Sequence, residues 1–147
     1  MNKVAIGTIG MNDSLVQGNG VEFNIVAKHN ILGGPTYGEK KIISGHKVYG
    51  VVYYGHCNNN TTINNFIGTD VTSKNPLPNA TGICFDCASN HNDVINCVLS
   101  GNIGYGLFYV TRGTEFNRLL GNMIGVDSSG TMAVPNDIGM VVSTGTA

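Results

Sequence analysis

The sequence contains no tryptophan, and only 12% of its 147 residues are charged. This charged fraction is about half of the roughly 25% found in globular domains, which argues against a helical surface covered with Lys and Glu. It also argues against a disordered chain, which combines high charge with low hydrophobicity, because 41% of these residues are hydrophobic. The formal net charge of −1 supplies no basic surface for phosphates, so we expect no nucleic-acid partner.

Long apolar runs and metal-ligand clusters are also missing. No run approaches the roughly 20 residues that a membrane-spanning helix needs, so we expect no membrane span. Cys84 and Cys87 have the C-x-x-C spacing of zinc and redox sites. The second half of a zinc site is absent, no helix follows, and residues i and i+3 of a strand point to opposite faces. We therefore expect ordinary buried or half-buried thiols, with a disulfide as the alternative, and neither a metal nor a cofactor.

Glycine, by contrast, is abundant, and its 21 copies mark a repeat. A glycine followed by an aliphatic residue and a short β-prone run occurs five times, beginning at Gly20, Gly50, Gly82, Gly106 and Gly139. Such runs, with β-branched and aromatic residues in period-2 alternation, are typical of strands of about five residues. No helical or leucine-rich repeat has this signature.

A second motif shows that long and short connections alternate. Ile-Gly-x-Asp at 67–70 and 124–127 leads through an apolar-Pro-Asn turn at 77–79 and 134–136 to the next glycine run. Shorter connections begin with a Ser-Gly turn and lead to the second and fourth runs. Both motifs repeat after 56 or 57 residues, so two unlike coils form the repeating unit.

Stacking these runs predicts a defined interior. If the first and third positions face inward and the strands lie about 4.8 Å apart, the third-position side chains form a ladder. The third-position residues are Phe23, Tyr53, Phe85, Tyr109 and Val142, and the first-position residues are Val21, Val51, Ile83, Leu107 and Met140. No amphipathic helical segment separates the runs. Further short strands are expected in their place, at 94–95, 98–99, 119–120 and 123–124.

Asparagine supports the same architecture. Asn30, Asn60, Asn92 and Asn117 fall at corresponding points, just after each aromatic strand. Asn tolerates left-handed turn conformations, and stacked Asn side chains can hydrogen-bond along a ladder. The alternative is that an Asn-rich chain places Asn at any turn. We predict an all-β, right-handed, single-stranded parallel β-helix of about five coils, with residues 1–147 as one domain.

Four short motifs carry a family resemblance. Residues 67–70, 77–79, 82–83 and 99–102 read I-G-T-D, L-P-N, G-I and L-S-G-N. They resemble the right-handed parallel β-helix repeats of the pectin-lyase-like superfamily, in the subtype of phage tailspike-like and bacterial surface proteins. The resemblance covers nearly the whole chain and implies an extracellular or virion (phage tail) location. It selects no activity, because lyases, glycoside hydrolases, epimerases, adhesins and plain spacers share this scaffold.

The repeat pattern is interrupted at both ends of the sequence. It begins inside a long connection and ends just after a strand. A solenoid needs polar caps, and no cap can be recognised at either end. Either partner chains cover the ends or the parent chain continues past them. We favour the second interpretation, in which 1–147 is an uncapped segment of a longer chain.

Candidate catalytic residues are few. Glu22 and Asp86 are expected to face outward from one sheet, two coils apart, with backbones roughly 12 Å apart. This separation is at the wide limit for an inverting carboxylate pair, so both are weak catalytic candidates and the question of enzymatic activity stays open. Asp70 and Asp127 occupy equivalent repeat positions, which predicts structural Asx-turn residues. His46 replaces the Asn of a Ser-Gly-Asn turn and is expected to be a tolerated turn substitution.

The outward face of the glycine-run strands is more informative. Alternation places Val52, Tyr54, Phe108 and Val110 outward on adjacent coils, as an apolar stripe of the kind that marks an interface or groove. Three explanations stay open: a long connection (69–81 or 126–138) covers the stripe, a neighbouring chain of a homotrimer covers it, or it contacts carbohydrate.

Carbohydrate contact would use polar neighbours of the same face. Tyr54 beside Asn24 and Asp86 suits a sugar ring, which stacks on an aromatic side chain while polar groups bind its hydroxyls. Our candidate ligand-binding residues are therefore Asn24, Tyr54, Asp86 and Phe108.

These observations lead to three functional expectations. The first is a rigid shaft or polysaccharide-contacting segment of a phage tailspike or receptor-binding protein, with bacterial surface polysaccharide and a homotrimer as expected partners. The second is part of a polysaccharide-degrading glycoside hydrolase or lyase. The third is a run of spacer repeats in a bacterial secreted adhesin.

Overall fold

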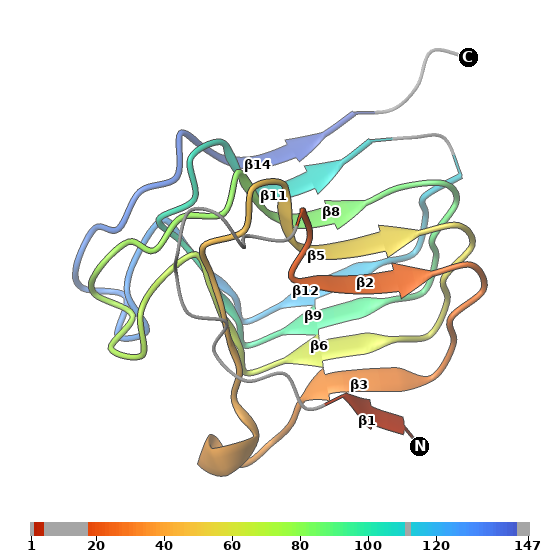
Figure 1. The fold of residues 1–147 in the computed structure, drawn as a ribbon, viewed down its shortest axis with the longest axis horizontal. Helices are drawn as coiled ribbons and strands as arrows, with labels where there is room; N and C mark the ends of the chain where they lie inside the picture. The colour runs from red at the N-terminus through yellow and green to blue at the C-terminus, as the bar shows by residue number, and fades with distance from the viewer. Residues whose placement is uncertain (1, 5–17, 111–112, 144–147) are drawn as a thin grey trace.

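The computed structural model describes residues 2–4, 18–110 and 113–143, which form three sheets of parallel strands (Figure 1). Sheet I contains β2 (Val21–Asn24), β5 (Tyr49–Tyr54), β8 (Thr81–Phe85), β11 (Tyr105–Tyr109) and β14 (Ile138–Val142). Sheet II contains β1 (Asn2–Val4), β3 (Asn30–Gly33), β6 (Thr61–Ile63), β9 (Asp93–Ile95) and β12 (Arg118–Leu120). Sheet III contains β4 (Ile42–Ile43), β7 (Phe66–Ile67), β10 (Val98–Leu99) and β13 (Met123–Ile124), and one 3-10 turn, η1 (Tyr37–Glu39), precedes β4.

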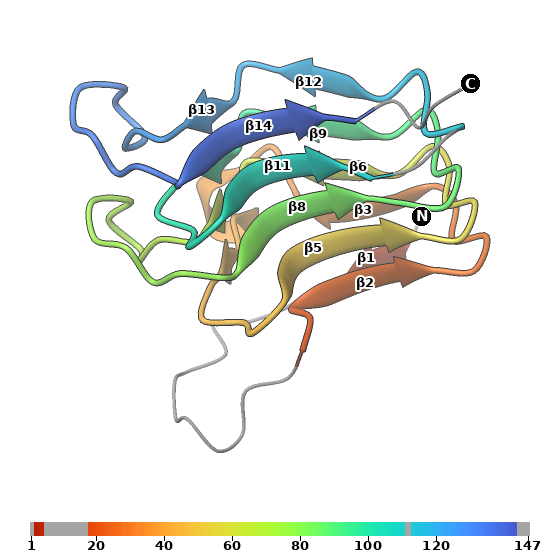
Figure 2. The ribbon, with the colours of Figure 1, turned by 90° about the horizontal axis from the view of Figure 1, so that it is seen from above.

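The chain winds through the three sheets in a fixed order. From each strand of sheet I it passes to sheet II, then to sheet III, and returns to sheet I beside the strand where the coil began. The winding is right-handed, as the view in Figure 2 shows. The fold is therefore the predicted right-handed parallel β-helix, and the four short strands expected between the glycine runs are β9, β10, β12 and β13.

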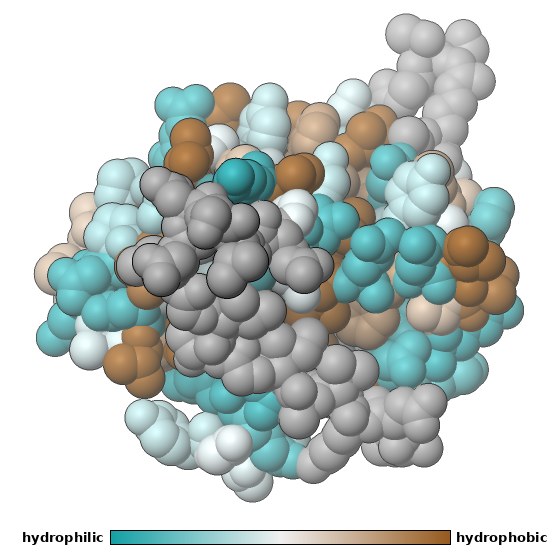
Figure 3. Space-filling model, in the orientation of Figure 1, coloured by the Kyte–Doolittle hydropathy of each residue, from teal (hydrophilic) through white to brown (hydrophobic). Residues whose placement is uncertain are grey.

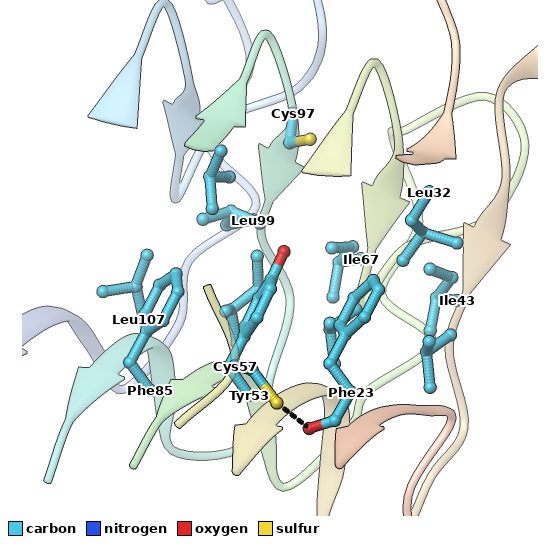
Figure 4. Close-up of a cluster of buried hydrophobic side chains, with 14 residues drawn as sticks. Phe23, Leu32, Ile43, Tyr53, Cys57, Ile67, Phe85, Cys97, Leu99 and Leu107 are labelled. Carbon is cyan, nitrogen blue, oxygen red and sulfur yellow. Dashed lines mark hydrogen bonds between the residues drawn. The ribbon is translucent and has the colours of Figure 1, made fainter. Parts of the chain in front are cut away.

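Stacked aromatic rings fill the interior beneath sheet I (Figure 4). The ring centroids of Phe23 and Tyr53 lie 4.7 Å apart, those of Tyr53 and Phe85 4.5 Å, and those of Phe85 and Tyr109 4.9 Å. Such offset stacks add to the free energy of area burial by about 0.5–1.5 kcal/mol per pair. The predicted ring ladder is confirmed, and Val142 continues it beside Tyr109.

Aliphatic side chains from the other two sheets close the core against these rings. Leu32 and Val94 come from sheet II, and Ile43, Ile67 and Leu99 come from sheet III; all five are at most 1% exposed. Each inward position therefore meets its counterpart one coil away, which is the stacking that the repeat predicts.

The predicted asparagine ladder runs along the corner between sheets I and II. Asn30 Nδ2 donates to Asn60 Oδ1 at 2.9 Å, Asn60 Nδ2 to Asn92 Oδ1 at 3.0 Å, and Asn92 Nδ2 to Asn117 Oδ1 at 3.1 Å. The backbone N–H groups of Asn30, Asn60 and Asn92 donate to the same three oxygens. These contacts satisfy amides that burial would otherwise penalise, because Asn60 is 1% exposed and Asn92 is 0% exposed.

A second ladder, which the sequence analysis did not identify, runs along the corner between sheets III and I. Asn79 Nδ2 donates to Asn102 Oδ1, and Asn102 Nδ2 donates to Asn136 Oδ1, both at 3.0 Å. The backbone N–H of His46 donates to Asn79 Oδ1 at 3.0 Å, so His46 occupies an Asn position, as expected. The imidazole is 4% exposed, and its burial lowers the pKa of His46.

The two long connections stack on each other at the edge on the left of Figure 1. Asp70 Oδ1 accepts from the backbone N–H of Thr72 at 3.0 Å, and Asp127 Oδ1 accepts from the backbone N–H of Thr131 at 3.0 Å. The turn roles predicted for both aspartates are therefore confirmed. Ser128 N donates to Ser73 Oγ at 2.9 Å and joins the two loops, although their sequence positions are 55 residues apart.

Candidate functional site

Three predicted ligand-binding residues meet at the carboxyl ends of the sheet I strands. Asn24 of β2 and Tyr54 of β5 are paired in register, and Asp86 N donates to Tyr53 O at 2.8 Å, which places Asp86 beside Tyr54. The Tyr54 side chain is 45% exposed. We call Glu22, Asn24, Tyr54 and Asp86 the Tyr54 cluster.

Negative charge surrounds the phenol of this cluster. The pKa of Tyr54 is raised, first by its contact with the Cys87 thiol and then by the charges of Asp86 and Glu22. Glu22 Oε1 accepts from Asn24 Nδ2 at 2.8 Å, and Asp86 Oδ1 accepts from Cys87 N at 2.7 Å. A carboxylate has about four lone-pair sites, so local bonds of this kind leave each group able to accept from ligand hydroxyls.

The catalytic candidates Glu22 and Asp86 come from β2 and from the end of β8. The strand β5 lies between these two strands, as the repeat predicts. A pair held two coils apart on one face is compatible with inverting chemistry but does not establish it, so their catalytic role stays a prediction.

The prediction of an exposed apolar stripe on sheet I is wrong. Val52 is only 4% exposed, Phe108 and Val110 are half-buried, and Tyr54 alone is well exposed. Phe108 pairs in register with Cys84, and its ring stacks on Tyr105 at 4.6 Å, so it lies in the column of Val52 and not in that of Asn24, Tyr54 and Asp86. On the side of the molecule that Figure 3 shows, the coloured hydrophobic side chains are scattered among hydrophilic ones.

A local break in the strand alternation explains this burial. A Cβ added to Gly50 would lie 2.8 Å from Ile67 Cγ2, so Gly50 and Val51 both point inward. The residue before them, Tyr49, then faces outward together with Val52, and its hydroxyl contacts the Cys84 thiol. Aromatic side chains of this extra outward column shield the small side chains beside them.

The long connections do not extend over the Tyr54 cluster. They project from the edge where the strands of sheet I begin, whereas Tyr54 lies where β5 ends (Figure 1). The first explanation left open for the stripe therefore fails for this residue.

No disulfide joins the four cysteines in the described residues, and Cys57, Cys84 and Cys97 are buried while Cys87 is half-buried, as expected. Burial raises the pKa of Cys84 and of Cys97 to about 12. Among the described residues there is no group of three or more His, Cys, Asp or Glu side chains that could hold a metal ion. No helix in the same residues is both long and apolar enough to cross a bilayer.

A polar pocket of about 280 Å³ lies on the outer face of sheet II. Arg118 Nε and Nη2 donate to the two carboxylate oxygens of Asp93 at 2.7 and 2.8 Å. The Phe116 ring stacks on His91 at 5.0 Å and is 69% exposed, and both residues have positive φ angles, 55° and 54°. A bulky residue in this conformation is an outlier, and the sequence gives no signal of it.

A cavity of about 460 Å³ lies on the outer face of sheet III, and the sequence analysis missed it. Phe66 and Val98 form its floor, and Tyr37 and Lys40 stand beside it. The sequence signal that could have revealed it is the length of one connection. Residues 34–41 join β3 to β4, whereas only two residues join the corresponding strands of the later coils.

Comparisons with protein-family models, with curated proteins and with solved structures found no match. The parallel β-helix is therefore shown by the arrangement of the strands, and membership of the pectin-lyase-like superfamily stays a prediction.

Proposed function

We propose that this chain is a polysaccharide-contacting β-helix segment of a surface protein of the pectin-lyase-like type, such as a phage tailspike or receptor-binding protein. The supporting observation is the Tyr54 cluster, in which an exposed aromatic ring lies between the amide of Asn24 and the carboxylate of Asp86. Sugars present apolar ring faces edged with hydroxyls, and a ring flanked by hydrogen-bonding groups is complementary to both.

The rest of the coil supports a rigid platform for such contact. Ring and asparagine ladders hold the backbone of each coil against the next, so the Tyr54 cluster is carried by β2, β5 and the residue directly after β8. The proposal includes a location outside the cell or on a virion, where bacterial surface polysaccharide is encountered, and a homotrimeric parent protein.

The direct test measures binding of purified capsular and O-antigen polysaccharides to the wild type and to Tyr54→Ala. We expect the affinity to fall by about tenfold, equivalent to 1.4 kcal/mol, because the stacking surface is lost. Ile103→Ala is the matched control, since Ile103 is 69% exposed and lies in the short connection before β11. Equal binding by Tyr54→Ala and the wild type would contradict the proposal.

A second candidate function is glycan cleavage by Glu22 and Asp86. It is favoured by one observation, namely that the two carboxylates lie on the same face of sheet I with only β5 between their strands. Release of reducing ends by the wild type, and its loss in both Glu22→Gln and Asp86→Asn, would establish an enzyme. Monomeric protein that binds no glycan would instead favour the adhesin spacer.

A further inference from the structure

An insertion interrupts the regular corner between sheets II and III. Later coils turn this corner with two residues, at 64–65, 96–97 and 121–122, whereas the coil containing β3 uses residues 34–41 and carries η1 there. This segment projects at the lower left of Figure 1. In solenoid proteins an insertion within one repeat marks a binding face in many cases.

The insertion is rigid and tied to the next coil. Glu39 Oε2 accepts from Thr36 N at 3.1 Å and from Thr36 Oγ1 at 2.9 Å, which closes a capping box around η1. Asn64 Nδ2 donates to Gly34 O at 2.7 Å and fixes the start of the insertion against the coil above. The backbone of the insertion is therefore held by hydrogen bonds before any ligand arrives.

The insertion forms one wall of the cavity on sheet III, which we call the sheet III groove. Its floor is a column of Phe66, Val98 and Met123, paired in register on three successive strands. The amides of Asn64 and Asn96 line the corner beside this floor. The groove thus combines an apolar base with hydrogen-bonding groups along one side.

The ammonium group of Lys40 lies at the end of the groove next to the insertion. Lys40 Nζ lies 3.8 Å from the Phe66 ring centroid and 5.1 Å from the Tyr37 ring centroid. Within the described ranges, the ion pair with a carboxylate is formed by Arg118 and Asp93. The contacts of Lys40 there are with the two aromatic rings. Partial burial lowers the pKa of Lys40, which is the expected effect of removing water from an ammonium group.

Tyr37 completes the set. Its side chain is 82% exposed at the tip of the insertion, beside Lys40. An exposed phenol on a rigid turn offers a stacking surface at low cost in conformational entropy, because its side chain has few rotatable bonds.

We propose that the sheet III groove binds a glycan segment carrying an anionic substituent, with the anion on Lys40, a sugar ring on Tyr37 and hydroxyls on Asn64 and Asn96. A carboxylate and a sulfate would satisfy Lys40 equally. The groove is independent of the Tyr54 cluster, which carries two carboxylates and disfavours an anionic sugar. The two sites therefore differ in charge and lie on separate faces of the β-helix.

The test uses three size-matched probes: uronate oligosaccharides, sulfated oligosaccharides and neutral dextran oligosaccharides, titrated by calorimetry at low and high salt. We expect an anionic probe to bind, added salt to weaken it, and dextran to bind at least about tenfold more weakly, as for loss of one charge-assisted contact. Binding by uronate or sulfate alone would identify the anion and supports the proposal.

Variants assign the binding to the groove. Lys40→Gln and Tyr37→Ala should each weaken the anionic probe by about tenfold, and Lys40→Arg should restore binding. Lys74→Gln, which removes an exposed cation from another loop, and Tyr54→Ala should leave it unchanged. Thermal unfolding of each variant checks that the fold is retained.

Several results would overturn the proposal. These are absence of anionic-probe binding, dextran binding as tight as the anionic probes, full binding by Lys40→Gln, or tighter binding of a glutamate-rich peptide. Loss of anionic binding in Tyr54→Ala alone would also overturn it and would leave the proposed function of the Tyr54 cluster standing.

Discussion

The hydroxyl of Tyr53 in sheet I bonds the hydroxyl of Thr62 in sheet II, inside the helix and away from solvent. Both side chains are 0% exposed, and burial raises the pKa of Tyr53 far above its usual value. This bond is the polar link across an otherwise apolar section of the core, and it lets a tyrosine replace phenylalanine in the ring ladder.

Removing both of these hydroxyls should cost less unfolding free energy than the sum of removing each one alone. Tyr53→Phe leaves the Thr62 hydroxyl buried without its partner, and we expect the free energy of unfolding to fall by about 1–3 kcal/mol. Tyr53→Phe combined with Thr62→Val should lose less than the sum of the single changes. Urea unfolding of the four proteins measures the coupling, and strictly additive losses would show that the bond is energetically unimportant.

The asparagine ladder predicts a large effect at its centre. Asn92 Nδ2 donates to Cys57 O at 2.8 Å, and Asn92 Oδ1 accepts from Asn60 N at 3.0 Å. Asn92→Ala leaves the buried carbonyl of Cys57 and the backbone N–H of Asn60 without these hydrogen-bond partners, so we expect the unfolding free energy to fall by about 3 kcal/mol or more. Asn24→Ala, at an exposed position, should stay within about 0.5 kcal/mol. A loss at Asn92 no larger than at Asn24 would contradict the ladder's role.

Most glycines at the start of the sheet I strands leave no room for a Cβ atom. A Cβ on Gly82 would lie 2.4 Å from the backbone oxygen of Gly106, which cannot move without disturbing the next coil. Gly82→Ala should therefore destabilise the fold by about 1–3 kcal/mol. Gly38→Ala is the matched control, since a Cβ there meets nothing within 4 Å. Similar melting temperatures for the two variants would exclude the steric explanation.

One exposed turn is strained and should be improvable. Val26 has a φ angle of 57° and is 57% exposed, a conformation that a β-branched residue adopts at a cost. Val26→Asn should raise the unfolding free energy by about 1 kcal/mol, because Asn tolerates left-handed geometry. Val71→Asn, on a residue 65% exposed but outside the positive-φ set, should give no gain in the same melting experiment.

The long loops predict a specific dependence on pH. The Ser129 hydroxyl and the backbone N–H of Met132 hold the pKa of Asp127 below its usual value. In the unfolded chain the carboxyl of Asp127 titrates with a pKa of about 3.9. Its contribution to the free energy of unfolding is therefore complete above that pH and is lost as the pH falls through the lower pKa of the folded state. Ser129→Ala should raise the pKa of Asp127, as measured by carboxyl NMR titration. Thr72→Ala, which affects the equivalent Asp70, should leave Asp127 unchanged.

The sequence predicted those features that repeat without interruption. Phe23 and Tyr53 recur at equal positions in their coils, so their stacking follows from periodicity alone. The same holds for Asn60 and Asn92, whose contact needs only a common position in successive turns. Stacking turns equal sequence position into spatial contact, and this part of the structure was therefore accessible.

The candidate site was predicted only in part, because it depends on departures from the repeat. Period-2 alternation correctly placed Val52 on the outer face, but two consecutive inward residues, Gly50 and Val51, also turn Tyr49 outward, and Val52 is only 4% exposed among these neighbours. Lys40 and Tyr37 lie in an insertion that no other described coil contains, so periodicity gave no information about them. Their relation to Phe66 is a tertiary contact across a corner, which local patterns do not encode.

The bond between Ser73 and Ser128 skips the intervening short connection, so a long loop rests on the next long loop and not on its immediate neighbour. Deleting or duplicating a single turn would set loops of unequal length against each other and break this contact. Length changes that preserve this contact should therefore add or remove an even number of coils. Recombination within the gene would then insert or delete whole pairs of coils, one with a long connection and one with a short connection.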